Sequence, residues 1–326
     1  MSLIETRNLT YIYDKKDPNG FDALHDINIQ IEKGDFVAIV GKTGSGKSTL
    51  VQTFNALLLP TSGETRVENF IITGDKKRLK KELKELPIEA QKDNKKLSKL
   101  RKKVGMVFQF PEYQLFAENV LKDVMFGPKN FGLSEEEAKK KSIEALTNVG
   151  LSEKYFQKSP FELSGGEKRR VAIAGILASE PEVLILDEPT AGLDPIGKRE
   201  IMELIKKYHE SGDKTIVVVT HDMDIVLNYA KKVIVLSDSK LIETLTPNEL
   251  FNTHDLTSYS LEIPTIYKFK NLLKNKGFAG FLDDKNDFNS IIDEITRVKK
   301  WAMYLDNWHI MTLQFIVLIH VLNSLV

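Results

Sequence analysis

The sequence contains no cysteine. That absence excludes disulfide frameworks, thiolate metal sites and cysteine nucleophiles, and it is typical of a protein that works in a reducing cytosol. The chain also lacks a net charge, since 46 basic residues balance 46 acidic ones, so its charge does not indicate a nucleic-acid partner. The first ten residues lack the basic start and apolar run of a signal peptide, so we expect a protein that is not secreted.

Length and composition are those of a folded protein without multiple membrane spans. Hydrophobic residues make up 42% of the chain and charged residues 28%, which excludes both extensive disorder and repeated spans. At 326 residues the chain exceeds the usual size of one domain. We therefore expect one large α/β domain with subdomains and a C-terminal appendage.

The order of apolar segments predicts two kinds of sheet. Leu3–Tyr13 and Ala23–Ile31 alternate in polarity around a Lys-Asp-Pro-Asn-Gly turn, which predicts antiparallel strands. Further on, short apolar strands alternate with helical stretches to about Ser237, and this alternation predicts a mainly parallel sheet with its chemistry at the carboxyl ends of the strands. Residues 35–40 precede a glycine-rich turn and a helix that begins near Lys47, and the expected buried strands are 104–108, 183–186, 215–219 and 233–236.

Two segments interrupt this order. Residues 75–103 are rich in lysine with scattered glutamate and have leucines at helical spacing, which predicts an exposed insertion. Mixed charges without interleaved aromatic residues favour a solvated helix face over a nucleic-acid site. The tail 301–326 ends in a stretch without charge, but that stretch is barely long enough to span a membrane and contains polar residues. A buried tail or a reading-frame artefact is therefore favoured over a membrane segment.

A glycine-rich turn between a strand and a helix matches the phosphate-loop pattern. The glycines let backbone amides turn toward phosphates, and the helix N-terminus favours negative charge. Lys47 is expected to neutralise β- and γ-phosphate charge, and the Ser48 hydroxyl to ligate Mg²⁺. The alternative, an ordinary glycine turn, is disfavoured by the flanking strand and helix. The predicted ATP-binding residues here are Gly41, Lys42, Thr43, Gly44, Ser45, Gly46, Lys47, Ser48 and Thr49.

Two carboxylates follow the predicted strand 183–186. Asp187 and Glu188 end this strand where a nucleotide on the phosphate loop would lie. Because side chains alternate along a strand, one carboxylate can face Mg²⁺ and the other the attacking water. Helix capping is the alternative role of such a pair. The phosphate loop earlier in the chain favours the catalytic interpretation.

The segment Leu163-Ser164-Gly165-Gly166-Glu167 has two compatible interpretations. Ser164 and Glu167 have the spacing of a capping box at a helix N-terminus. The two glycines would also let this helix approach an anion closely, and the natural source of that anion is the ATP of a second subunit. This segment resembles the signature sequence of the ATP-binding cassette (ABC) family, and the resemblance covers about Met1–Lys240.

The resemblance implies a role for each matching residue. Glu188 would polarise the hydrolytic water, His221 would reach the γ-phosphate, and Asp187 and Gln109 would lie beside Mg²⁺ together with Ser48. Signature residues 164–167 would act on the partner's ATP, and the loop that ends at Asp194 would cross to the opposite subunit. Tyr13 resembles the aromatic residue that stacks on adenine, worth about 1 to 3 kcal/mol if it resembles other base stacking. Tyr11 is the rival, disfavoured because it alternates with Leu9 on one strand face.

Residues 107–116 and 126–132 resemble the energy-coupling factor branch of this family. That resemblance implies a pair of ATPase subunits, a transmembrane coupling protein and a small membrane protein that captures vitamins or metal ions. The segment Phe110–Lys129 would form the docking groove, whereas buried core aromatics are the alternative explanation. It also implies a peripheral position on the cytoplasmic face of the membrane, with no nucleic-acid partner.

These expectations divide the chain into three parts. Residues 1–240 would form an ABC-type ATPase domain with a RecA-like parallel core, an antiparallel β region and a helical signature subdomain at about 106–170. Residues 241–300 would form an accessory or dimerisation region, followed by the tail. A soluble cassette ATPase is disfavoured because the chain lacks an internal repeat and sustained heptads. Another ABC transporter branch stays open, and neither the cargo nor self-pairing versus pairing with a paralogue follows from the sequence.

Overall fold

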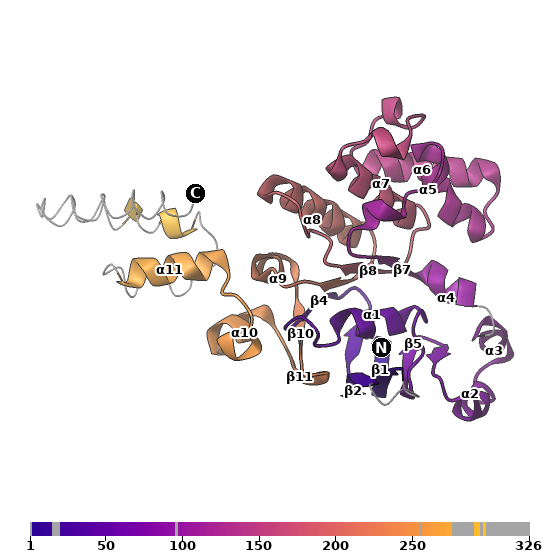
Figure 1. The fold of residues 1–326 in the computed structure, drawn as a ribbon, viewed down its shortest axis with the longest axis horizontal. Helices are drawn as coiled ribbons and strands as arrows, with labels where there is room; N and C mark the ends of the chain where they lie inside the picture. The colour runs from indigo at the N-terminus through magenta and orange to yellow at the C-terminus, as the bar shows by residue number, and fades with distance from the viewer. Residues whose placement is uncertain are drawn as a thin grey trace, which may run out of the picture. The chain divides into compact units, whose positions relative to one another are not determined.

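A computed structural model describes residues 2–14, 20–94, 97–253, 256–275, 290–293 and 296–297 (Figure 1). It contains two compact units, Met1–Leu261 and Glu262–Val326. The expected domain boundary at 240 falls inside the first unit, because the strand that begins there pairs with its neighbour in the sheet. The tail 301–326 lies outside the described residues.

An antiparallel sheet forms the N-terminal part of the first unit. Its path is β2-β1-β5-β6, and β3 pairs with β1 beside this path. Every pairing within it is antiparallel, which confirms the expected antiparallel region. The strands are β1 (Ser2–Tyr13), β2 (Phe21–Ile27), β3 (Gln30–Glu32), β5 (Ser62–Val67) and β6 (Phe70–Ile72).

A second, mainly parallel sheet forms the core of this unit. Its order is β11-β10-β4-β9-β8-β7, in which only β11 is antiparallel to its neighbour among the described strands. Every residue of β4, β7, β8 and β9 is buried, as expected of strands covered on both faces. The strands are β4 (Phe36–Val40), β7 (Val104–Val107), β8 (Val183–Asp187), β9 (Thr215–Val219), β10 (Lys232–Ser237) and β11 (Lys240–Leu245).

Helices pack around this sheet, and their starts follow from local sequence. Ser134 and Ser164 both form capping boxes, which confirms the capping interpretation of the signature segment. Helices α5, α6 and α7 gather as one group in Figure 1. The helices are α1 (Lys47–Phe54), α5 (Val120–Asn130), α6 (Glu135–Asn148), α7 (Gly165–Leu177), α8 (Pro195–Glu210), α9 (Met223–Tyr229) and α10 (Pro247–Thr253). Short 3-10 helices cover η1 (Pro111–Gln114), η2 (Glu153–Tyr155), η3 (Pro160–Glu162) and η4 (Leu256–Tyr259).

The lysine-rich insertion folds into three short helices between β6 and β7. They are α2 (Lys76–Leu83), α3 (Ile88–Asn94) and α4 (Leu97–Lys103). No residue of α2 or α3 is fully buried, in agreement with an exposed segment, but Leu100 of α4 is fully buried in the core. This leucine attaches the insertion to the hydrophobic core just before β7 begins.

The second unit contains one well-described helix, α11 (Thr265–Asn275). Phe269 and Leu273 of this helix are buried, so the helix has an apolar face. Among the helices that the structure describes, none has both the length and the apolar character needed to cross a bilayer.

Candidate functional site

The phosphate loop connects β4 to α1, at the carboxyl edge of the parallel sheet. Two of its three glycines are required by space as well as by conformation. Gly46 has a φ of +96°, and a Cβ there would lie 2.2 Å from the carbonyl oxygen of Ala23. Gly41 has a φ of +145°, and a Cβ there would lie 2.0 Å from the carbonyl oxygen of Leu236. The backbone therefore passes where no side chain fits, as expected of a phosphate cradle.

The start of α1 has free anion-binding capacity. Its N-cap, Gly46, has no side chain to accept from the first amides of the helix. The buried hydroxyl of Ser45 has no hydrogen-bond partner in the part of the chain that the structure describes. Lys42, Thr43, Gly44 and Ser48 are exposed around this point, while Thr49 is buried. The start of α1 and the Ser45 hydroxyl thus retain hydrogen-bond donors that an anion could use.

Lys47 is held inside the loop by two backbone carbonyls. Its Nζ donates to Gly41 O at 2.7 Å and to Lys42 O at 2.9 Å. Burial lowers the pKa of Lys47, and the nearby carboxylates of Glu188 and Asp187 oppose that shift. The two carboxylates thus compensate only part of the positive charge of the Lys47 ammonium, and a phosphate group would supply the missing negative charge.

The two carboxylates after β8 occupy different environments. Asp187 is the last residue of β8 and is 6% exposed. Burial raises its pKa, while a hydrogen bond from Ser48 and the charge of Lys47 oppose that change. Glu188 has a φ of +50°, so the chain leaves the strand direction at this residue. The strand does not continue, and this left-handed turn rather than strand alternation separates the two side chains.

Glu188 contacts a histidine from the neighbouring strand end. His221 follows β9, which pairs with β8 in parallel, and its Nδ1 lies 2.9 Å from Glu188 Oε1. The histidine side chain is 75% exposed and the glutamate side chain 14%. The pair therefore lies at the surface of the sheet edge, where it can reach a ligand on the phosphate loop.

Tyr13 is the last residue of β1, and its hydroxyl forms a hydrogen bond of 3.3 Å with that of Thr49 in α1. Its ring stacks on Phe21, with centroids 5.2 Å apart, and meets Tyr11 edge-on at 4.8 Å. Phe21 is 60% exposed, and no sequence pattern singled it out. Tyr11 packs against the core, whereas Tyr13 and Phe21 stack on each other where β1 ends and β2 begins.

The signature segment lies exposed at the start of α7. Ser164 accepts from the Glu167 amide, and Glu167 accepts from the Ser164 amide and hydroxyl at 2.8 Å each. Hydrogen bonds from the Ser164 amide and hydroxyl and from the Tyr155 hydroxyl lower the pKa of Glu167. A Cβ at Gly165 or Gly166 would meet no atom within 4 Å among the described residues. The packing of this chain therefore does not require glycine at either position.

A buried arginine that the sequence did not reveal joins the signature helix to two other segments. Arg169 of α7 is 2% exposed and donates to both carboxylate oxygens of Glu112 in η1, at 3.0 and 2.7 Å. It also donates to Ala191 O at 2.7 Å, in the loop that leads to Asp194. Asp194 caps α8 through the Gly197 amide at 2.6 Å. Gln109 is exposed just after β7.

The site residues thus form two groups. The phosphate loop, Asp187, Glu188 and His221 come together at the carboxyl ends of adjacent strands. Residues 164–167 of the same chain bond to Tyr155 and to one another, and no hydrogen bond or ion pair among the described residues joins them to this group. A phosphate loop beside a strand-end aspartate and glutamate defines a P-loop nucleotide-binding protein.

The ABC transporter family model matches residues 24–191, and the chain belongs to this family. Within it, the energy-coupling factor transporter ATP-binding protein EcfA2 of Enterococcus faecalis is 50% identical over 277 residues, or 85% of this chain and 90% of the relative. EcfA2 of Lactobacillus gasseri is 45% identical over 294 residues, covering 90% of this chain and 96% of the relative. These relatives place the chain in the energy-coupling factor branch, as expected from residues 107–116 and 126–132.

Solved structures agree with this assignment. CbiO1 of Clostridium perfringens, described as part of the ABC transporter complex cbiONQ, aligns with a TM-score of 0.64 and 38% identity, over 83% of this chain and 99% of its own. The ATP-binding cassette MJ0796, in a dimeric post-hydrolysis state with ADP and Pi, aligns with a TM-score of 0.62 and 32% identity, over 75% of this chain and 98% of its own. The predicted α/β cassette fold is thereby confirmed.

Proposed function

We propose that this chain hydrolyses ATP to energise an importer of the energy-coupling factor type, as one of two cassettes. The observation that carries the proposal is the convergence of Lys47, Asp187 and Glu188 at one sheet edge, with His221 in contact with Glu188. Convergence of a phosphate cradle with two carboxylates is what phosphoryl transfer to water requires. The energy-coupling factor relatives support the choice of branch.

ATP binding falls to the phosphate loop and the tyrosine of β1. The amides of the loop and Lys47 bind the phosphates, with Thr49 holding Tyr13 in place. The ring of Tyr13 stacks on the base, supported from its other side by Phe21. The full set is Tyr13, Gly41, Lys42, Thr43, Gly44, Ser45, Gly46, Lys47, Ser48, Thr49 and Gln109.

The residues around Asp187 fit a magnesium ion. Ser48, Gln109 and Asp187 offer hydroxyl, amide and carboxylate oxygens, the ligand type that Mg²⁺ prefers. No group of three or more His, Cys, Asp or Glu side chains able to hold a metal exists among the described residues, so phosphate oxygens of ATP would complete the coordination. A bound Mg²⁺ would neutralise charge that develops on the transferred phosphoryl group. Burial favours the neutral form of Asp187, and a cation beside it would favour the carboxylate.

Glu188 positions and activates the attacking water. As a carboxylate it accepts a hydrogen bond from His221 Nδ1, which directs one of its oxygens and leaves the other for water. The same contact places a hydrogen on Nδ1 of His221, so Nε2 can donate to a γ-phosphate oxygen only when it carries a second hydrogen. Lys47 stays close to both carboxylates and stabilises the charge on the phosphoryl oxygens.

A second cassette completes the site. The exposed segment Ser164–Glu167 has glycines that its own chain does not need, and a closely approaching phosphate explains them. The loop that ends at Asp194 would cross to the opposite subunit in the same assembly. Both halves of the site are complete in this chain, so a copy of this chain and a paralogue would each serve as the second cassette.

Membrane partners would dock on exposed aromatic residues near the signature helix. Phe116 and Phe126 are 59% and 51% exposed and meet edge-on at 4.9 Å, and Tyr113 is 85% exposed. Aromatic side chains of this kind anchor protein interfaces. We assign this surface to the transmembrane coupling protein, which in turn binds the substrate-capturing membrane subunit. The chain would then lie peripherally on the cytoplasmic face of the membrane. It would energise the import of vitamins or metal ions, which only the membrane subunits would contact.

Co-purification from the native host in mild detergent tests the assignment. The tagged chain should bring a second cassette ATPase, one coupling protein and small substrate-binding membrane proteins, identified by mass spectrometry. Recovery of ribosomal proteins alone, or of no membrane protein, would refute it. A second sample with Phe116→Ser and Phe126→Ser should retain the second cassette and lose the coupling protein.

A further inference from the structure

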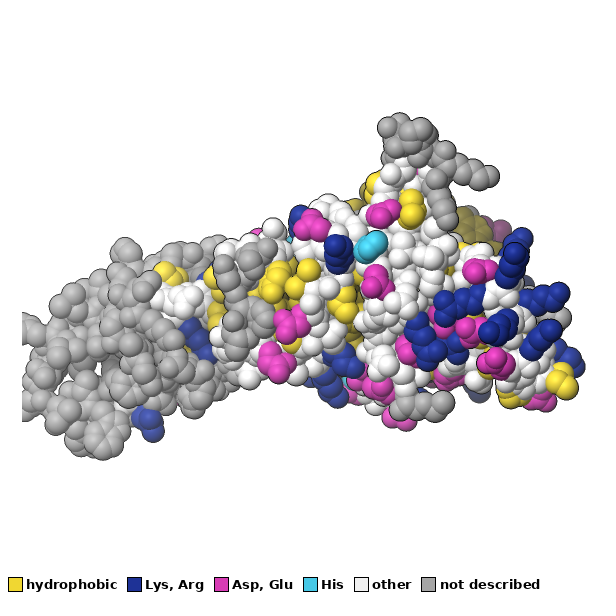
Figure 2. All heavy atoms as spheres, turned by 90° about the horizontal axis from the view of Figure 1, so that it is seen from below, with side chains coloured by type: hydrophobic (Ala, Val, Ile, Leu, Met, Phe, Trp, Pro, Cys, Tyr) yellow, Lys and Arg dark blue, Asp and Glu magenta, His cyan; other side chains and the backbone are white. Residues whose placement is uncertain are grey.

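Helix α2 of the insertion has two chemically distinct faces. One face is half-buried and consists of Arg78, Leu79, Glu82 and Leu83. The other is exposed and consists of Lys76, Lys77, Lys80, Lys81 and Lys84, here called the lysine face. Residues three and four apart share one side of a helix, so these five side chains form one continuous surface. Figure 2 shows Lys and Arg gathered with several acidic residues on the side that carries α2 and α3.

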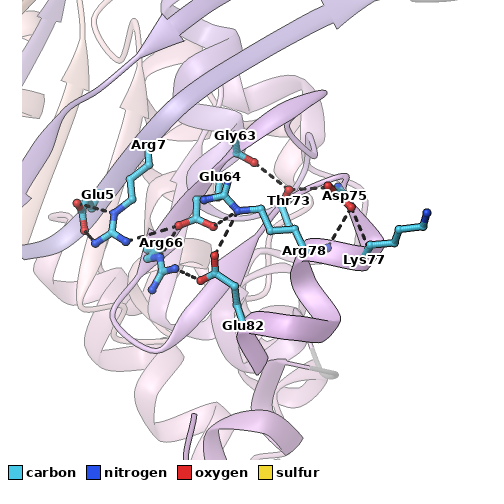
Figure 3. Close-up of polar contacts among 10 residues, drawn as sticks. All are labelled: Glu5, Arg7, Gly63, Glu64, Arg66, Thr73, Asp75, Lys77, Arg78 and Glu82. Carbon is cyan, nitrogen blue, oxygen red and sulfur yellow. Dashed lines mark hydrogen bonds and ion pairs between the residues drawn. The ribbon is translucent and has the colours of Figure 1, made fainter. Parts of the chain in front are cut away.

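A buried carboxylate fixes the rotation of this helix. The side chain of Glu64 in β5 is completely buried, with Arg78 Nε at 3.1 Å and Arg66 Nε at 2.6 Å (Figure 3). Arg66 also pairs with Glu82 of α2, one turn after Arg78. Figure 3 shows Arg78 and Glu82 pointing toward Glu64, while Lys77 points away. These ion pairs hold the apolar side of α2 against the sheet and keep the lysine face outward.

The lysine face concentrates positive charge on one side of α2. Among the residues that the structure describes, none of its five ammonium groups has an ion-pair partner, whereas other lysines such as Lys103 and Lys141 pair with glutamates. Lysines at positions 76 and 80, 77 and 81, and 80 and 84 are four residues apart and repel one another. Residues 75–103 hold 13 Lys and Arg against 5 Asp and Glu, in a chain with 46 of each sign. An anionic surface would relieve this repulsion.

We propose that the lysine face binds the anionic phospholipid headgroups of the membrane. Four to eight basic residues on an amphipathic helix are typical of anionic lipid binding. Nucleic acid fits less well, because the one arginine of α2 is turned inward and residues 75–103 contain no aromatic residue to stack on a base. Because Leu79 and Leu83 face the protein, the contact is electrostatic and stays at the headgroup level. This lipid binding goes beyond the proposed transport function, since the chain would bind the membrane without any other subunit.

Vesicle co-sedimentation of the purified full chain tests this proposal. Vesicles of phosphatidylcholine alone are compared with vesicles containing about a third phosphatidylglycerol. The chain should bind the anionic vesicles and leave them as salt rises to about 0.5 M, where charges are screened within a few ångströms. Changing all five lysines of the face to Gln should weaken binding at least about tenfold, and changing them to Arg should preserve it.

A matched control separates the lysine face from overall charge. Lys139, Lys140, Lys206, Lys207 and Lys231 are also exposed, and changing them to Gln removes the same charge from other elements. This control should bind anionic vesicles like the unchanged chain. Equal loss in both variants, no loss in the lysine-face variant, or binding to RNA without binding to vesicles would each overturn the proposal. ATPase activity, measured in parallel, tests the proposed function separately and should be the same in both variants.

Discussion

His221 Nδ1 lies 2.9 Å from Oε1 of Glu188, so the two residues that follow adjacent parallel strands are joined by one hydrogen bond. An ionised carboxylate can only accept, and the proton therefore sits on Nδ1 when the bond forms. Glu188 and His221 then act as one unit, and each should be tested in a way that separates its own role.

Glu188→Gln should reduce ATP turnover by about 10² to 10⁴, the usual size of a general-base effect. Glutamine has the same shape but is a poor base, so ATP affinity should stay unchanged. Turnover is measured by phosphate release and affinity by nucleotide titration. Lys47→Ala is the control, because it should lose nucleotide affinity as well. Normal turnover in the glutamine variant would contradict the assignment.

His221→Ala should lower kcat by about 10², the cost of misplacing a catalytic group by a small distance. His221→Gln keeps a donor within reach of Glu188 and should recover part of that loss. The comparison shows whether the histidine acts by positioning Glu188. If glutamine and alanine variants are equally inactive, the imidazole has a role of its own at the phosphate.

Gly166→Ala should separate stability from activity. A Cβ here meets no atom within 4 Å, and alanine is favoured over glycine inside a helix, so the free energy of unfolding should rise by about 0.5 kcal/mol. ATP hydrolysis should nevertheless fall at least about tenfold, because in the proposed pair the added methyl group would lie toward the partner's nucleotide. Gly46→Ala is the contrasting variant, expected to lose stability because its Cβ would lie 2.2 Å from Ala23 O. Full activity of Gly166→Ala would refute the signature role.

Glu64→Gln should destabilise the first unit. The change leaves Arg66 and Arg78 without their shared buried carboxylate. Breaking such a cluster should lower the free energy of unfolding by about 3 kcal/mol. This is the low end of the usual range for buried ion pairs, because both arginines are partly exposed. Urea unfolding measures the loss. Glu5→Gln is the matched control: its pair with Arg7 is more exposed and should be worth less than about 1 kcal/mol. If both variants lost the same free energy of unfolding, burial would not determine how strongly the Glu64 cluster stabilises the protein.

The local elements of both halves of the site were predictable because their signals lie in adjacent residues. The phosphate loop, the strand before Asp187 and the capping box at Ser164 each depend on residues adjacent in the chain, and the structure has the loop, strand and cap as predicted. The left-handed turn at Glu188 was not predictable, since nothing in the residue type demands it.

The sequence did not predict the long-range contacts, and the reason is physical. Glu64 and Arg78 look like ordinary surface charges until the insertion folds back on β5 and buries the carboxylate. Likewise the stacking of Phe21 on Tyr13 depends on the register of β1 and β2, which pair these two residues directly. The boundary expected at 240 missed β11, because antiparallel pairing with β10 is decided by the neighbouring strand and not by composition.

Arg169 has a consequence for communication between two cassettes. Its guanidinium holds together Glu112 of the segment proposed to dock on the coupling protein, the loop before Asp194 and the helix that begins with the signature. In the proposed pair, that helix serves the nucleotide of the opposite chain. A movement that the membrane partner imposes on one cassette would therefore reach the ATP bound to the other cassette first. In each cassette, the buried side chain of Arg169 would link the timing of the two hydrolysis events.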